Sequence, residues 1–168
     1  MIIEFVVGYD YKKNGYSMDE FREEFISEYG YSDEIDEETV NDNPSHLIAM
    51  IEDDQVIGWA IWHECSTSEH RVGFPRDEED MKILERLSNG PCEAIELHEL
   101  WLKKAYRGKG YGKQFFDFFE DFVLTNGDNR IFYYSDNASA ISLCRKRGYK
   151  ESYGEGFRWH TFFKEIHK

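Results

Sequence analysis

The segment Arg107-Gly108-Lys109-Gly110-Tyr111-Gly112 combines three glycines with basic residues, directly after a hydrophobic stretch and directly before a helical pattern. Glycine lets the backbone adopt positive φ and lets main-chain N–H groups approach a bulky anion. A helix that begins here adds its unpaired N–H groups and the positive end of its dipole. Arg107, Lys109 and Lys113 add full positive charges. The segment therefore predicts a binding site for a pyrophosphate group.

Two familiar phosphate-binding motifs fit this turn poorly. A Walker A loop requires GxxxxGK followed by Ser or Thr, but Gly112-Lys113 is followed by Gln114, and Arg107 stands where the first glycine belongs. A GxGxxG dinucleotide fingerprint matches at Gly108 and Gly110 but meets Lys113 at its third glycine. That fingerprint also belongs early in a parallel sheet, whereas this turn comes late in the chain.

The elements that must position this turn follow from hydrophobic periodicity and capping residues. Strands are predicted at residues 2–7, 47–51, 56–62, 94–102, 130–135, 149–153 and 157–166. Helices are predicted after Ser17 (with Glu20 as a capping box), between residues 32 and 40, at 77–87, after the glycine turn, and from Asp136 or Asn137 to Arg147. Residues 52–55 have hairpin-turn chemistry, and Gly154 and Gly156 lie between the last two strands. The order predicts an α/β (α+β) fold with a mixed sheet and helices on its faces.

Length and composition predict one domain over residues 1–168. The chain is 40% hydrophobic and 17% aromatic, which is enough to fold around a core. It contains no run long enough to span a bilayer, and its first ten residues do not resemble a signal peptide. Cys65, Cys92 and Cys144 are scattered and form no zinc spacing, so the sequence predicts a reducing cytoplasm and no metal site.

The two halves of the chain differ in charge. Residues 1–90 hold 23 acidic and 7 basic residues, a balance of −16, whereas residues 91–168 hold 11 acidic and 13 basic residues, a balance of +2. A nucleic-acid-binding domain would carry a basic face, so neither DNA nor RNA is an expected partner. The asymmetry predicts that the second half binds an anion and that the first half attracts a cation.

A second motif, later in the chain, favours a third interpretation of the glycine turn. Arg107, Gly110 and Gly112 satisfy the pattern Q/R-x-x-G-x-G/A, and residues 137–149 (NASAISLCRKRGY) resemble N-x-x-A-I-x-L-Y-x-x-x-G-F/Y at the distance of one helix and one strand. Together these motifs resemble the GNAT superfamily of acetyl-CoA-dependent N-acetyltransferases. The resemblance extends to the element order of the whole chain. It implies a GNAT fold with a mostly antiparallel sheet of about seven strands, splayed at the cofactor site.

The resemblance also implies where acetyl-CoA would bind. Main-chain groups of Leu100, Trp101 and Leu102 would pair with the pantetheine amides. The turn formed by Arg107, Gly108, Lys109, Gly110, Tyr111 and Gly112 would hold the pyrophosphate, and Asn137 would bond to the pantetheine arm. Asn137 is also a good helix cap, and Lys109 and Lys113 could equally be solvated charges.

Acetyl transfer to an amine needs a base, because an ammonium group has no lone pair. Glu96 lies eleven residues before Arg107, the spacing at which histone acetyltransferases of this family place their strand glutamate. His98 is the alternative base, and Glu99 is an ordinary strand residue unless a bulge changes the alternation. Cys144 stands where many members have a tyrosine general acid. A thiol could donate a proton but reaches less far, and a small buried hydrophobe is the alternative reading.

The acceptor predicted by the charge pattern is a cationic amine. Residues 19–42 hold eleven carboxylates and one basic residue, and aromatic residues are interleaved, a combination that attracts ammonium groups, although a solvated surface explains many of these charges. A polyamine, another small amine or a peptide amine would fit. The alternative function is a non-catalytic CoA-binding module. The segment Phe157-Arg158-Trp159-His160 makes a homodimer conceivable, and no membrane partner is expected.

Overall fold

The computed structural model describes residues 3–11, 13, 18–30, 33–152 and 160–167. They form two compact units, Met1–Ile61 with Glu99–Arg107, and Trp62–His98 with Gly108–Lys168, and each unit is described by itself. The helices are α1 (Met18–Tyr29), α2 (Glu34–Asp42), α3 (Glu78–Ser88), α4 (Tyr111–Thr125) and α5 (Ala138–Lys146), with 3-10 turns η1 (Pro44–His46) and η2 (Lys104–Tyr106). The strands are β1 (Glu4–Val7), β2 (Leu47–Glu52), β3 (Gln55–Ser66), β4 (Glu69–Arg71), β5 (Phe74–Pro75), β6 (Glu93–Leu102), β7 (Arg130–Ser135), β8 (Lys150–Ser152) and β9 (His160–Glu165).

The main sheet has the hydrogen-bonding order β1-β2-β3-β6-β7-β9-β8. The pairs β1–β2, β2–β3, β7–β9 and β8–β9 are antiparallel, and β6–β7 is parallel. The β6–β7 register runs only from Ile95–Ile131 to Leu97–Tyr133, although β6 itself continues to Leu102. A mixed, mostly antiparallel sheet of seven strands with helices is therefore confirmed.

The first unit joins β1, β2 and the first part of β3 to α1 and α2. Asp53 and Asp54 link β2 to β3 with φ of 49° and 63°, the left-handed pair of a tight hairpin turn. Trp59 and Trp101 pack in the core with their ring centroids 4.2 Å apart and their ring planes tilted by 32°, and Phe25 of α1 packs against Trp59. Phe25 of α1 and Val40 of α2 belong to one buried cluster with Leu47 and Trp59, so each helix contributes an apolar side chain to the core of this unit.

Gly58 of β3 is required for the close approach of β6 in this unit. A Cβ at Gly58 would lie 2.5 Å from the Trp101 carbonyl oxygen and 3.1 Å from the Leu102 Cα. The Lys103 N–H also donates to the Ile57 carbonyl oxygen at 2.8 Å. The backbone of β6 therefore occupies the space that a side chain at position 58 would need.

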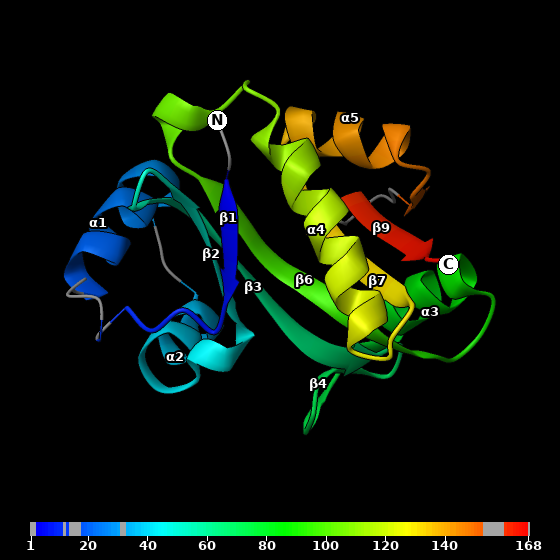
Figure 1. Cartoon of the computed structure of the whole chain (residues 1–168). Coiled ribbons are helices and arrows are strands. Elements are labelled where there is room, and N and C mark those ends of the chain that lie inside the picture. Colours follow the sequence, from blue (N-terminus) through cyan, green and yellow to red (C-terminus); the bar gives the residue numbers. More distant parts are fainter. Residues whose placement is uncertain (1–2, 12, 14–17, 31–32, 153–159, 168) are drawn as a thin grey trace. The chain divides into compact units, whose positions relative to one another are not determined.

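The second unit has helices on both faces of its strands (Figure 1). On one face, Ile83, Leu84 and Leu87 of α3 pack in a buried cluster with Phe132 of β7 and Phe163 of β9. On the other face, Phe116 of α4 contacts Tyr133 of β7 with the ring centroids 5.8 Å apart. Because Phe132 and Tyr133 are adjacent, strand alternation sends them to opposite faces and each face receives a helix.

The sequence predicted no helix or strand between residues 63 and 76. The structure extends β3 to Ser66 and follows it with the short antiparallel hairpin β4–β5. Asp77 then caps α3 by accepting a hydrogen bond from the Asp80 N–H at 2.8 Å. Hydrophobic periodicity does not predict this hairpin, because β4 and β5 are too short and too polar to show an alternation of apolar and polar residues.

Some predictions lie outside the described residues. These are the Ser17–Glu20 capping box, the turn containing Gly154 and Gly156, and most of the Phe157-Arg158-Trp159-His160 segment. The two final strands are antiparallel, as predicted. Among the described residues, no helix has the length and apolar character needed to cross a membrane.

Replacing Gly58 with alanine should destabilise the protein, because the new Cβ would overlap the β6 backbone. We expect the free energy of unfolding to fall by about 1–3 kcal/mol. Urea denaturation followed by circular dichroism measures it. Gly112→Ala is the matched control, since a Cβ there meets only Leu143 Cδ2 at 3.4 Å. A Gly58→Ala variant as stable as this control would contradict the prediction.

Candidate functional site

The predicted anion-binding turn leads directly into α4. Gly108 and Gly110 have φ of 77° and 84°, a conformation that favours glycine. Gly110 is the N-cap of α4 and supplies no side-chain hydrogen bond, so the first N–H groups of the helix receive no cap from it. Gly108, Lys109 and Gly110 are exposed. The local backbone is therefore one that can present N–H groups to an anion.

Arg107 has an ionic partner in the first unit. Its Nη1 and Nη2 lie 2.6 Å and 2.7 Å from the two carboxylate oxygens of Glu28, and its Nε donates to the Leu102 carbonyl oxygen at 2.7 Å. Trp101 Nε1 also donates to Glu28 at 3.0 Å. The hydrogen bond from Arg107 lowers the pKa of the Glu28 carboxyl despite partial burial. In this geometry Arg107 anchors α1 to the end of β6, and its guanidinium is already paired with Glu28.

Asn137 and Cys144 both lie on or beside α5. Asn137 is the N-cap of this helix, and its Oδ1 accepts a hydrogen bond from the Ala140 N–H at 3.1 Å. Cys144 is fully buried, and burial raises the pKa of its thiol to about 12. The cap that the sequence offered as an alternative for Asn137 is present. Burial favours the interpretation of Cys144 as a packing residue.

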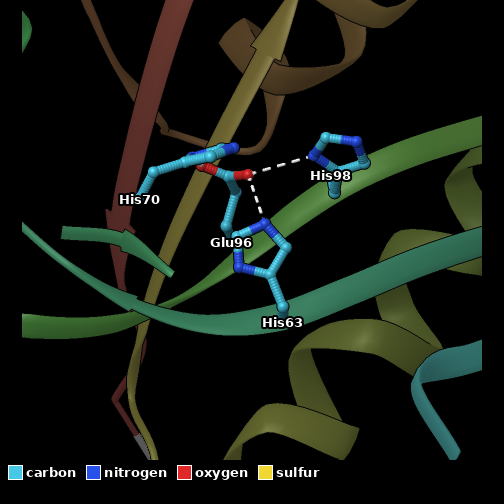
Figure 2. Close-up of side chains that lie close together, drawn as sticks. All are labelled: His63, His70, Glu96 and His98. Carbon is cyan, nitrogen blue, oxygen red and sulfur yellow. Dashed lines mark hydrogen bonds and ion pairs between the residues drawn. The ribbon is translucent and has the colours of Figure 1, made fainter. Parts of the chain in front are cut away.

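Glu96 is a fully buried carboxylate surrounded by histidines (Figure 2). His63 Nε2 lies 2.7 Å and His98 Nδ1 lies 3.3 Å from Glu96 Oε2, and His70 Nδ1 lies 3.1 Å from Oε1. The side chains of His98 and His70 are 13% and 36% exposed, whereas that of Glu96 is 1% exposed. We call these four residues, His63, His70, Glu96 and His98, the histidine cluster.

The neighbouring histidines stabilise the negative charge of Glu96. Burial raises the pKa of the Glu96 carboxyl, but the close imidazoles of His63, His70 and His98 outweigh burial and leave that pKa well below its usual range. Glu96 is therefore ionised. As strand alternation predicted, Glu96 and His98 lie on the same side of β6.

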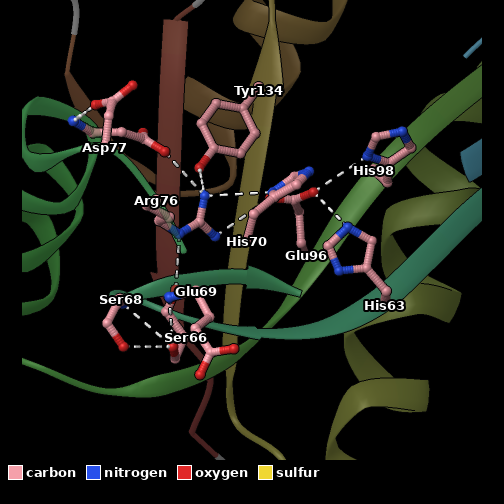
Figure 3. A network of polar contacts seen from close by, with 11 residues as sticks. His63, Ser66, Ser68, Glu69, His70, Arg76, Asp77, Glu96, His98 and Tyr134 are labelled. Atoms are coloured by element: carbon pink, nitrogen blue, oxygen red, sulfur yellow. Dashed lines mark hydrogen bonds and ion pairs between the residues drawn. The ribbon is translucent and has the colours of Figure 1, made fainter. Parts of the chain in front are cut away.

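Arg76 supports this cluster from the segment that precedes α3 (Figure 3). Its side chain is 1% exposed, and its Nη2 lies 3.5 Å from Glu96 Oε1. Nη1 donates to Asp80 Oδ2 and to Tyr134 Oη, each at 3.1 Å, and Nε donates to the Ser66 carbonyl oxygen at 2.9 Å. The guanidinium thus joins β3, β7, α3 and Glu96 in one network.

The sequence indicated Glu96 and His98 as candidate bases, but it did not predict that His63, His70 and Arg76 would surround Glu96. His70 and Arg76 lie in or beside the unassigned β4–β5 hairpin, and His63 lies in the part of β3 beyond the predicted strand end. Their separations along the chain match no compact ligand motif. For His63, the sequence shows only that it follows the predicted apolar strand 56–62. That position does not reveal that its side chain meets Glu96 of another strand.

Comparison with protein families agrees with the two sequence motifs. The Acetyltransferase (GNAT) family matches residues 14–149. The chain belongs to this family. The GNAT resemblance is therefore confirmed, and the protein is an acyltransferase of a family that uses acetyl-CoA as co-substrate.

Solved structures share the GNAT fold with this protein. A polyamine N-acetyltransferase of Drosophila melanogaster, which forms N-acetylagmatine, has a TM-score of 0.68 at 10% identity, over 98% of this chain and 100% of that chain. The apo form of an agmatine N-acetyltransferase variant has a TM-score of 0.66 at 11% identity, over the same shares. The PaiA N-acetyltransferase of Thermoplasma acidophilum in complex with coenzyme A has a TM-score of 0.57 at 18% identity, over 99% of this chain and 100% of that chain. At these identities the likeness establishes the fold alone. Comparison with curated protein sequences gave no match.

Replacing Arg76 with glutamine should destabilise the protein strongly, because Glu96 and Asp80 would lose a buried cationic partner. We expect the free energy of unfolding to fall by about 3–5 kcal/mol. Arg71→Gln is the matched control, since the Arg71 guanidinium lies 4.1 Å over the Phe74 ring at the exposed tip of the hairpin and should contribute about 0–1 kcal/mol. Equal losses in urea denaturation would show that the Arg76 network is not essential to stability.

Proposed function

We propose that this protein transfers the acetyl group of acetyl-CoA to a cationic amine by direct attack of the amine on the thioester. The observation that carries the proposal is the match to the GNAT family together with two left-handed glycines at the start of α4. No covalent enzyme intermediate is required, because an amine is a strong enough nucleophile once it is neutral. The protein must hold the thioester, remove one proton and stabilise the oxyanion.

For acetyl-CoA, the family motif assigns the pyrophosphate to the turn of Gly108, Lys109, Gly110, Tyr111 and Gly112, with Lys113 following it. The exposure of Gly108, Lys109 and Gly110, and a helix start at which Gly110 supplies no side-chain cap, support this assignment. Main-chain groups of Leu100, Trp101 and Leu102 are proposed partners of the pantetheine amides. Arg107 would act mainly by fixing the start of the turn, since Glu28 holds its guanidinium. Asn137 would contribute through its amide while its oxygen caps α5.

For the proton of the amine, we propose that Glu96 and His98 act as a pair. Glu96 is buried too deeply to meet a substrate directly, but it lies 3.3 Å from His98 Nδ1 and can orient that ring. His98 is more exposed and would accept the proton. This assignment unites the two alternatives from the sequence, with Glu96 as the positioning carboxylate and His98 as the base.

For the acceptor, the acidic composition of α1 and α2 favours an amine with additional positive charge. Glu24 and Glu28 are matched by Lys103 and Arg107 within the first unit, but residues 19–42 hold eleven carboxylates. The agmatine and polyamine acetyltransferases that share the fold act on such amines. We therefore place polyamines and agmatine first, before amino acids and peptides.

The turn is tested by comparing two glycines with the same backbone conformation at opposite ends of α4. Gly110 and Gly127 both have φ of 84° with no atom within 4 Å of an added Cβ, so alanine costs similar strain at either position. We expect Gly110→Ala to weaken acetyl-CoA binding about tenfold, equivalent to about 1.4 kcal/mol, and Gly127→Ala to leave it unchanged. Calorimetric titration with acetyl-CoA measures both. Equal affinities would remove the turn from the binding site.

The base is tested with His98→Ala in a thiol-release assay using saturating acetyl-CoA and a panel of polyamines, agmatine, amino acids and peptides. We expect kcat to fall about 10²–10⁴-fold. Cys144→Ala should leave kcat within a few-fold of the wild-type value, because the buried thiol acts in packing. A large loss on replacing Cys144 in a folded protein would restore it as the general acid.

The alternative function gives a different pattern in the same experiments. A non-catalytic CoA-binding module would melt at a higher temperature with acetyl-CoA and release no thiol with any amine.

A cytoplasmic location, a single functional domain and a homodimer stay predictions. Their sequence basis is the cysteine pattern, the continuous element order and the segment at residues 157–160.

A further inference from the structure

We propose that the histidine cluster binds a divalent transition-metal ion, with Zn²⁺ as the representative ion. Its ligands would be His63 Nε2, His70 Nδ1, His98 Nδ1 and a carboxylate oxygen of Glu96. These donor atoms all lie within 4.8 Å of one another in the second unit. Three imidazole nitrogens and one carboxylate form a donor set suited to Zn²⁺ and to other ions of intermediate softness.

The spacing of the donor atoms fits one ion. With metal–ligand bonds of about 2.0–2.1 Å, adjacent donors of a tetrahedral site lie about 3.3 Å apart. Glu96 oxygens lie 2.7 Å from His63 Nε2, 3.1 Å from His70 Nδ1 and 3.3 Å from His98 Nδ1. Figure 2 shows the rings converging on this carboxylate from three different strands. Small side-chain movements would bring four donors to one centre.

The hydrogen bonds around the rings leave lone pairs directed at the carboxylate. His63 Nδ1 lies 3.1 Å from the Glu64 carbonyl oxygen, which can only accept, so Nδ1 carries the proton. In a neutral ring, His63 Nε2 then has a lone pair facing ionised Glu96. The two atoms lie 2.7 Å apart, and His63 Nε2 has no hydrogen-bond partner among the described residues. A cation between these two electron-rich atoms would remove their mutual repulsion.

The second ring repeats this pattern. Arg76 Nη1 lies 3.5 Å from His70 Nδ1 and can only donate, so in the neutral ring this nitrogen carries a lone pair, and a metal ion would replace this long hydrogen bond. A hydrogen bond from His63 Nδ1–H to a backbone carbonyl is the usual way in which a protein orients a metal-binding Nε2. Protonating all three rings instead would gather four cations, with Arg76, around one buried carboxylate. One divalent ion bound by neutral rings places fewer positive charges there.

Arg76 is the group that opposes a bound cation. Its guanidinium is paired with Asp80 at 3.1 Å, so the charges of Arg76 and Asp80 largely cancel. The charge of Glu96 is then left to attract the ion. The side chain of His70 is 36% exposed and gives solvent access to the cluster, whereas the buried His63 and Glu96 fix the geometry.

Metal binding does not depend on the proposed acetyl transfer. A ring that binds an ion through Nδ1 carries its proton on Nε2 and cannot accept another from an amine. The metal-bound and catalytic states of His98 would therefore exclude each other. Binding is measured without acetyl-CoA, and acetyl transfer is measured after chelator treatment, so either proposal can fail alone.

The test titrates chelator-treated full-length protein with ZnCl₂ by calorimetry, and with CoCl₂ by visible absorption to report coordination geometry. We expect one ion per chain and the ligand-field bands of tetrahedral Co²⁺. His70→Ala, at the most exposed ligand, should fold and lower the affinity at least about tenfold. Glu96→Gln should also lower it. His167→Ala, an exposed histidine outside the cluster, should bind as the wild-type protein does.

Several results would contradict the proposed metal site. Absence of saturable binding would show that a proton, and no metal ion, bridges His63 and Glu96. An unchanged affinity in folded His70→Ala, an equal loss in His167→Ala, or an octahedral Co²⁺ spectrum would indicate adventitious surface binding. Circular dichroism of each variant confirms folding before titration, and each of these results would overturn the proposal.

Discussion

Removing a carboxylate from water is costly unless nearby groups replace its hydration, and Glu96 imposes this constraint on the second unit. Its carboxylate is fully buried on β6, and every group that compensates it comes from another element or another position of the same strand. Arg76 reaches it from the segment before α3, and His63 and His70 reach it from β3 and β4. The hairpin, the extended end of β3 and the start of α3 are therefore coupled to one charge.

This coupling explains why a short and polar hairpin is ordered. The β4–β5 hairpin buries little apolar surface, since its Val72 and Phe74 side chains are 85% and 52% exposed. The Arg76 hydrogen bonds to Ser66, Asp80 and Tyr134 fix the chain on the far side of the hairpin. In this segment the hydrogen bonds and ion pairs of Arg76, and not buried apolar side chains, hold the chain in place.

The chemistry of the site depends on the same arrangement. A carboxylate that is fully enclosed is a poor direct acceptor of a proton from a substrate, but it is well placed to orient imidazoles and to raise their affinity for a cation. Both proposed roles of the cluster, Glu96 orienting His98 as the base and four donors binding a divalent ion, depend on imidazole nitrogens that lie close to one ionised carboxylate. Under these proposals, a proton on the cluster would leave His98 available as a base, and a metal ion would not.

The sequence by itself determined the family, the glycine turn, the capped helices and nearly every element of the sheet, because these follow from local spacing and from periodicity. Gly110 at positive φ, Asp77 as a cap and the Asp53–Asp54 turn all lie where backbone chemistry requires them. Only the tertiary structure decided that His63 and His70 surround Glu96, that Arg107 is held by Glu28, and that Cys144 is buried. Those contacts join residues up to 79 positions apart, and no local pattern records which distant side chain will share a buried space.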